Sequence, residues 1–303
     1  MTFRTPNLAS NAGSLLDFRR VKERMAILNQ QISTGKRIVN LSDDPTGSAL
    51  IMDFRNSIER NEQYSRQIDS AASFLVAGEL SLTGISDHLM RLMEMGVQAQ
   101  GAAATDSMRA ALVPEAQGIL TSMLSLANRQ DQGKYLFSGT MTDTKPFSGA
   151  SVAPTVYLGD GNSINLDVNL GNSVATNLIG SSVFIGSGAP NTDLFQQVSL
   201  FIQGLGPPST PAQIQAAATN IDTIFSGIQQ QIAELGGRQA ALQQIKTTLG
   251  DFNLGLSSIQ ETYEAIDYPQ AVAEYQQESI VQQASLSMMS RSNTQQNLFN
   301  FLS

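Results

Sequence analysis

The chain has 303 residues, enough for two or three domains, and its net charge of −8 argues against nucleic acid as a main partner. It has no cysteine and one histidine, which excludes disulfides, zinc–cysteine sites and histidine metal clusters. Charged residues make up 15% and aromatic residues 6%, so helical packing of Ala, Leu, Ile and Met has to supply most of the core.

The first predicted element is a helix whose apolar residues recur at helix-turn spacing. They are Leu8, Ala12, Leu15, Phe18, Val21, Met25, Leu28 and Ile32. Glycine is common just after a helix end, so Gly35 predicts that this helix ends within residues 33–37. The helix also carries a basic run, which usually marks a solvated face but could pair with acidic neighbours in an assembly: Arg19, Arg20, Lys22 and Arg24.

A second, long helix is predicted to begin at Pro45, with Asp44 as its N-cap. Its apolar stripe runs in steps of three and four residues, a spacing typical of coiled-coil packing: Ile51, Phe54, Ile58, Ile68, Ala72, Leu75, Leu82, Ile85, Leu89 and Leu92. After a turn of small residues at 101–106, a third helix is predicted to end near residues 131–133, and Pro114 either starts it or kinks it.

From Tyr135 to about Pro190, glycine and turn residues recur at short intervals. Residues 164–170 alternate between apolar and polar, which indicates a β-strand. With residues 155–158 and the turn at 159–162, this strand is predicted to form a β-hairpin. The segment is therefore expected to be a small β domain inserted between helices.

Helical pattern returns for the last third of the chain. Helices are predicted over residues 194–205 and 211–265, and a break at 267–269 follows because the residue before a proline disfavours helix. The terminal helix, from Gln270 onwards, is apolar on two sides. One side holds Val272, Tyr275, Leu286 and Met289, and the other holds Ile280, Ala284, Met288, Leu298 and Leu302.

The two terminal helices predict self-assembly, because a helix that is apolar in several directions is usually surrounded. The spacers in the last helix are mainly Gln, Ser and Asn, which allow identical helices to pack side by side without facing like charges. The alternative is a buried hairpin partner within the same chain. The predicted assembly interface consists of Phe18, Val21, Met25, Leu28, Ile32, Val272, Tyr275, Ile280, Leu286, Met289, Leu298 and Phe301.

The order of the elements predicts a mostly α fold. It is a long coiled-coil-like helical bundle formed by the N- and C-terminal halves, with a small inserted β domain at the far end. We expect a terminal-helix assembly layer of residues 1–40 and 268–303, a helical body of 41–134 and 191–267, and the β domain at 135–190.

Sequence motifs give no support for catalysis or for a cofactor. Gly35-Lys36-Arg37 fails as a phosphate loop, since Gln30 stands where the first glycine belongs. The segment from Asp160 fails as a calcium loop, because its twelfth position is Gly171. His88 is expected to be a solvated or interface residue. No apolar run approaches membrane-spanning length and no signal-like apolar region follows the start, so neither membrane insertion nor signal cleavage is expected.

Two motifs resemble a known family. Ser33-Thr34-Gly35-Lys36-Arg37-Ile38 followed by Ser42-Asp43-Asp44-Pro45 is similar to the N-terminal signature of bacterial flagellins and their junction relatives. Residues 134–140 (Lys-Tyr-Leu-Phe-Ser-Gly-Thr) and 144–147 (Thr-Lys-Pro-Phe) resemble, more narrowly, the hook-associated protein 3 group. The Gln- and Ser-rich last helix ending at residues 298–302 also fits.

The resemblance implies a structural subunit at the hook–filament junction of the bacterial flagellum. It implies four partners: copies of the same chain, hook-associated protein 1, flagellin, and an export chaperone at the C-terminal region. The terminal helices would line an inner tube, the middle helices would surround it and the β domain would face outward. The protein would be extracellular, exported by the flagellar type III route without a cleaved signal.

Three alternatives stay open. The nearest is a flagellin, although many flagellins end in a Leu-Leu-Arg type tail and this chain ends Asn300-Phe301-Leu302-Ser303. Where flagellins that contact an innate immune receptor often have Arg, this chain has Met93, although Arg91 and Glu94 match. More distant alternatives are a secreted coiled-coil effector or translocator, and an enzyme whose site lies in the β insert.

Overall fold

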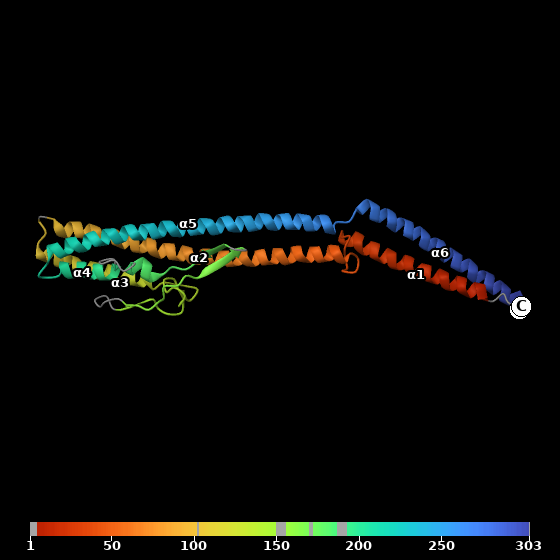
Figure 1. Ribbon diagram of the computed structural model, residues 1–303, viewed down its shortest axis with the longest axis horizontal. Helices are drawn as coiled ribbons and strands as arrows, with labels where there is room; N and C mark the ends of the chain where they lie inside the picture. The colour runs from red at the N-terminus through yellow and green to blue at the C-terminus, as the bar shows by residue number, and fades with distance from the viewer. Residues whose placement is uncertain (1–4, 102, 150–155, 170–171, 187–192, 303) are drawn as a thin grey trace. The chain divides into compact units, whose positions relative to one another are not determined.

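The computed structural model describes residues 5–101, 103–149, 156–169, 172–186 and 193–302. As predicted, the chain is mostly helical, with long helices from both ends and short strand pairs between them (Figure 1). The helices are α1 (Thr5–Thr34), α2 (Pro45–Gln100), α3 (Asp106–Ala127), α4 (Leu194–Leu205), α5 (Pro211–Glu264), α6 (Tyr268–Leu302) and the short π-helix η1 (Ser181–Ile185).

The chain forms two compact units. Unit 1 lies within residues 1–60 and 252–303, and unit 2 comprises residues 61–251. The long helices α2 and α5 each contribute one end to unit 1 and the remainder to unit 2.

Helix boundaries follow local capping chemistry. Helix α1 ends at Thr34, and Gly35 adopts a φ of +69°, the left-handed conformation that glycine tolerates best. Asp44 caps α2, since its Oδ1 accepts from the Gly47 N–H at 2.9 Å. Thr105 caps α3, so Pro114 lies inside this helix and does not start it. Helix α3 ends at Ala127, before the predicted residues 131–133.

In unit 2, α2 and α5 bury residues at a strict seven-residue repeat, as coiled-coil packing requires. The repeat on α2 is Ile68, Leu75, Leu82 and Leu89, and on α5 it is Ile214, Ile221, Ile228, Leu235, Leu242 and Leu249. Every one of these side chains is less than 9% exposed. Ile68, Leu75, Leu82 and Leu89 of the apolar stripe predicted for α2 are therefore confirmed as core, whereas Phe54, Ile58 and Ala72 of that stripe are half-buried.

Polar contacts between α2 and α5 show the relative direction of the two helices. Lys246 Nζ lies 2.5 Å from Asp69 Oδ1, Gln239 donates to Glu79 at 2.8 Å, and Gln229 donates to Ser86 at 2.7 Å. The partner's number on α5 falls as the number on α2 rises, so the two helices run antiparallel.

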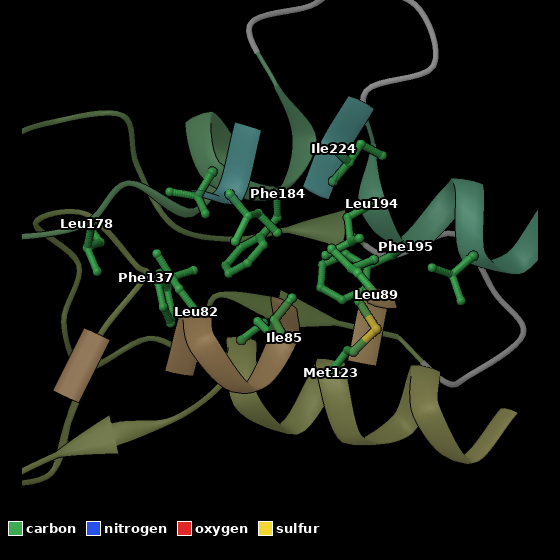
Figure 2. Packing of buried hydrophobic residues seen from close by; sticks show 14 of the residues in the cluster. Leu82, Ile85, Leu89, Met123, Phe137, Leu178, Phe184, Leu194, Phe195 and Ile224 are labelled. Carbon is green, nitrogen blue, oxygen red and sulfur yellow. The ribbon is translucent and has the colours of Figure 1, made fainter. Parts of the chain in front are cut away.

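Helices α3 and α4 and the β region pack against the α2–α5 pair in one hydrophobic core. Helix α3 packs on α4 and buries Ala116, Ile119, Leu120, Met123 and Ala127. Figure 2 shows the core where Met123 of α3, Leu89 of α2, Leu194 of α4 and Ile224 of α5 converge with side chains of the β region. Four phenylalanines form a connected aromatic cluster with ring centroids 4.9–6.0 Å apart: Phe137, Phe147, Phe184 and Phe195.

Six short strands form three antiparallel pairs. They are β1 (Gln130–Asp131) with β2 (Lys134–Tyr135), β3 (Phe147–Ser148) with β4 (Val156–Tyr157), and β5 (Asn165–Asn169) with β6 (Asn172–Ala175). The β1–β2 turn uses Gln132 and Gly133, both with positive φ, as a two-residue hairpin turn of this kind requires. Strand pairing thus begins at Gln130, ahead of the predicted Tyr135.

The predicted hairpin between residues 155–158 and 164–170 is wrong. Residues 156–157 pair with 147–148, and 165–169 pair with 172–175. The turn between the two predicted strands is anchored to residues 137–140. The Thr140 N–H and hydroxyl donate to the Asp160 carboxylate, and the Tyr157 hydroxyl donates to the Phe137 carbonyl. Long-range anchors, which a local pattern cannot reveal, decided the strand partners.

Two helices contain an 18-residue window that is apolar enough, by composition, to cross a membrane. These windows lie in α2 and α3, with mean hydropathy 1.2 in each, and 39% and 28% of them are buried inside the chain. Core helices of water-soluble proteins pass the same test, so the windows are weak evidence for membrane spans. The expectation that no apolar run approaches membrane-spanning length is wrong for α2 and α3, and the predicted absence of membrane insertion stays a prediction.

Candidate assembly interface

Helices α1 and α6 lie side by side in unit 1 and use part of the predicted interface on each other (Figure 1). On α1, Val21 is 9% and Leu28 is 6% exposed, and Phe18, Met25 and Ile32 are half-buried. On α6, Val272, Tyr275 and Met289 are half-buried. These eight predicted residues thus contribute to a seam within one chain, which is the alternative that the sequence left open.

The other side of α6 remains exposed. Ile280 is 67%, Val281 42% and Met288 70% exposed, and Ala284 between them is exposed too. At 100° per residue these four positions share one face, here called the α6 stripe, and Met289 of the seam lies on a different side. Leu286, at 50% exposure, adds apolar surface outside the stripe. The prediction that α6 is apolar on two sides is confirmed for the described side chains.

Helix α1 also presents apolar surface to solvent. Leu15, Leu16 and Ile27 are 45%, 55% and 44% exposed, although Leu15 was predicted to belong to the apolar stripe of α1. The sequence prediction missed Leu16 and Ile27 because they stand outside that single stripe. Leu298 and Phe301, two further predicted interface residues, lie outside the side chains that the structure describes.

Charge is sparse along α6, which carries Glu274, Glu278 and Arg291, whereas α1 carries a charged run over residues 17–24. An ion pair joins the two helices, with Arg24 Nε 3.5 Å from Glu278 Oε1. Glu274 accepts from Gln270 of its own helix at 3.0 Å. Many of the polar side chains that border the α6 stripe are Gln and Ser, so a neighbouring helix could approach without facing a like charge.

Two short non-helical breaks, one before α2 and one after α5, are joined to each other by backbone hydrogen bonds. Lys36 and Ala265 form an antiparallel bridge, in which the Arg37 N–H donates to the Glu264 carbonyl at 2.7 Å and the Ile266 N–H donates to the Gly35 carbonyl at 3.1 Å. The break after α5 occupies residues 265–267, and Asp267 caps α6 by accepting from the Gln270 N–H at 3.1 Å. Pro269 therefore lies in the first turn of α6, where a missing N–H costs no hydrogen bond.

The Glu264 carboxylate lies at the centre of this junction and is 8% exposed. Lys36 Nζ and Arg55 Nη2 each lie 2.6 Å from it, and Gln260 Nε2 donates to it at 2.9 Å. Burial by itself raises the pKa of this carboxyl, but hydrogen bonds from Lys36, Gln260 and Arg55 outweigh burial and lower the pKa below its usual value. Glu264 is therefore a buried, ionised group with partners on three segments.

Other candidate sites carry no comparable arrangement. Among the described residues, no group of three or more His, Asp or Glu could hold a metal ion. The Asp160 carboxylate is engaged by Thr140 and Asn162, whose hydrogen bonds lower its pKa to about 2. An open hollow of about 410 Å³ in unit 2 is lined mainly by polar side chains, among them Gln67, Asp131 and Lys134. His88 is half-buried on α2.

Comparisons with known proteins agree on one family. Residues 7–142 match the bacterial flagellin N-terminal helical region, and residues 218–302 match the bacterial flagellin C-terminal helical region. Together the two matches cover more than half of the chain.

Individual relatives carry hook-associated names. The chain is 27% identical over 276 residues to flagellar hook-associated protein 3 of Escherichia coli (strain K12), covering 84% of this chain and 86% of that protein. Its fold is similar to a putative flagellar hook-associated protein from Vibrio parahaemolyticus (TM-score 0.68, 23% identity, 74% of this chain and 100% of that chain). It is also similar to the flagellar junction protein FlgL from Legionella pneumophila (TM-score 0.59, 20% identity, 72% and 100%).

Proposed function

The chain belongs to the bacterial flagellin family, and on that basis we propose that it is a structural subunit that joins the flagellar hook to the flagellin filament. Two relatives named flagellar hook-associated protein 3 are 27% and 26% identical to this chain over most of its length, against 23% for a flagellar filament core protein of Treponema maltophilum, which supports this role over that of a filament subunit. We further propose that it self-assembles through its terminal helices.

One observation carries the assembly proposal: α6 keeps an exposed apolar stripe after its other side has been covered by α1. Two of its four residues, Ile280 and Met288, are at least two-thirds exposed. Large exposed apolar side chains gathered on one face mark an interaction surface more often than scattered ones do. Copies of the same helix pair fit this face, because the polar residues around it are largely uncharged.

The predicted interface therefore divides into two sets. Seam residues such as Val21, Leu28 and Tyr275 hold the helix pair together within a subunit, and Ile280 of the α6 stripe faces a neighbouring subunit. Leu286, Leu298 and Phe301 are proposed as further contacts between subunits. The division into an assembly layer (1–40 and 268–303), a helical body (41–134 and 191–267) and a β domain (135–190) is part of the same proposal.

We assign four partners to this subunit: copies of itself, hook-associated protein 1, flagellin, and an export chaperone that binds the C-terminal region. The proposed location is outside the cell, at the hook–filament junction, after export without signal cleavage. The relatives' names support a place in the flagellum, and the specific partners rest on the resemblance to the hook-associated protein 3 group.

Labelled antibody on isolated flagella tests the location. A band at the hook–filament boundary is the expected result. Label along the whole filament would identify a flagellin, and absence of label from the flagella of cells that express the intact protein would contradict both. Deleting the gene should leave hooks intact and release flagellin into the medium.

Truncation tests the role of the terminal helix. Deleting residues 270–303 should leave a soluble, folded body that cannot assemble, and the expected phenotype is loss of filament attachment and swimming. If the truncated chain still supports swimming, the terminal-helix proposal is wrong.

A secreted translocator is the second candidate, favoured only by the apolar windows in α2 and α3. Binding of the purified chain to liposomes would support it.

We also propose that the protein is not an enzyme, since its relatives carry names of structural flagellar proteins and the polar hollow in unit 2 presents no His or Cys among its lining residues.

A further inference from the structure

The junction between the two chain breaks contains an ion-pair cluster around one buried carboxylate, and the proposed function does not by itself explain this cluster. The cluster consists of the Glu264 carboxylate and its donors Lys36, Arg55 and Gln260, here called the Glu264 clamp. Glu264 is the last residue of α5, Lys36 lies in the break before α2, and Arg55 lies on α2. One carboxylate therefore ties together the end of α5, the N-terminal break and α2, all within unit 1.

The Glu264 carboxylate is the most buried one among the ion pairs of the described residues, although its partners Lys36 and Arg55 are 45% and 52% exposed. Arg20–Asp17 and Arg66–Glu62 are largely exposed on both sides, and exposed pairs contribute little because water screens them. Glu264 is 8% exposed, and both of its ion pairs are 2.6 Å long. Burying a carboxylate is costly unless its partners are well placed, so such a cluster adds little net stability but specifies one geometry strongly.

The backbone around the clamp shows which geometry is specified. The Arg37 and Ile266 amides donate across the two breaks on either side of Lys36 and Ala265. The Arg37 guanidinium adds contacts of 3.4 Å to the Asp44 carboxylate and to the Tyr263 carbonyl. Helix α1 enters this junction at Thr34 and α6 leaves it at Tyr268, so the junction sets where both terminal helices begin.

We propose that Glu264 is a positioning residue for assembly, which clamps the two chain breaks together so that α1 and α6 leave the α2–α5 pair of unit 1 as one joined pair. The assembly part of this inference rests on the proposed function. The clamp itself does not, because it concerns contacts within a single chain.

Hydrogen exchange in the intact full-length chain tests the clamp. In Glu264→Ala, the Arg37 and Ile266 amides should exchange about 10- to 100-fold faster than in the parent, because charge-assisted hydrogen bonds that hold the breaks are lost. Glu261→Ala is the matched control: Glu261 lies one turn earlier on α5 and lines an open hollow of about 360 Å³ together with Lys36 and Glu264, but its side chain is exposed. Its exchange should equal that of the parent.

Two outcomes overturn the clamp. One is a parent chain whose Arg37 and Ile266 amides exchange as fast as those of unfolded peptide, and the other is unchanged exchange in Glu264→Ala. If Glu264→Ala does not fold, Arg55→Gln replaces it, since this variant removes one ion pair and keeps Lys36. The Arg55→Gln variant should show a smaller acceleration at the same two amides, and an unchanged rate overturns the clamp.

A second arm tests positioning. Expressed in a strain that lacks the gene, Glu264→Ala should assemble at the junction at least about tenfold less well than Glu261→Ala at equal export. Faster exchange with normal assembly would overturn the positioning role and leave the proposed function standing. If the parent protein itself never assembles at the junction, the proposed function fails, and the exchange measurement still decides the clamp.

Discussion

Asn128 and Phe147 exchange two hydrogen bonds: Asn128 Nδ2 donates to the Phe147 carbonyl at 3.1 Å, and the Phe147 N–H donates to Asn128 Oδ1 at 2.9 Å. The side-chain amide thus pairs with the first residue of β3 as a neighbouring strand would. Asn128 follows the last residue of α3, so this pair fastens the β region to the helices of unit 2.

Replacing Asn128 by Ala should lower the free energy of unfolding by about 2–3 kcal/mol, since two hydrogen bonds are lost and the Phe147 backbone groups lose their partners. Asn128→Asp should also destabilise, because a carboxylate cannot donate to the Phe147 carbonyl. Urea denaturation measures both. Thr121→Ala, on the exposed face of α3, is the control and should stay within about 0.5 kcal/mol of the parent.

Two glycines should respond to alanine in opposite directions. At Gly180, an added Cβ would meet the Phe137 carbonyl oxygen at 2.5 Å and the Tyr157 ring at 2.9 Å. Gly180→Ala should therefore destabilise unit 2 by about 1–3 kcal/mol. At Gly236, inside α5, a Cβ meets nothing within 4 Å, and Gly236→Ala should stabilise by about 0.5–1 kcal/mol. Equal effects at the two sites in thermal denaturation would contradict this packing.

The Asp160 carboxyl should titrate near pH 2. Hydrogen bonds from Thr140 and Asn162 favour its ionised form, and they lower its pKa from 3.8 to about 2. Because the folded-state pKa is the lower one, the anchor is fully present above the unfolded pKa and is lost as the pH falls through about 2. Carboxyl NMR shifts measure the titration, with the urea-unfolded chain as reference. A midpoint near 4 in the folded chain would rule out the anchor.

Charge on the α6 stripe should block assembly and leave the subunit folded. The double variant Ile280→Glu with Met288→Glu places carboxylates where the proposed neighbour packs, so it should not assemble at the hook, although its circular dichroism should match the parent. The control is Gln283→Glu, which adds charge to an exposed polar position of the same helix. Normal assembly of the double variant would remove the stripe from the interface.

Periodicity predicted the helices and their cores well, because coiled-coil packing depends on local spacing. The seven-residue repeats of α2 and α5, the end of α1 at Gly35 and the start of α2 at Pro45 are all local features, and the structure confirms them. The β region was predicted less well. Its strands are short, and their partners are chosen by distant anchors such as the pairing of Asn128 with Phe147 and of Thr140 with Asp160.

The sequence by itself determined that the terminal helices carry more apolar surface than one neighbour covers. Only the tertiary structure decided which side of α6 meets α1 and which side, with Ile280 and Met288, stays exposed. It also revealed Glu264, which is one glutamate among many in the sequence. Its two charged partners stand at positions 36 and 55, and only folding brings residues so far from position 264 in the chain within hydrogen-bonding distance of its carboxylate.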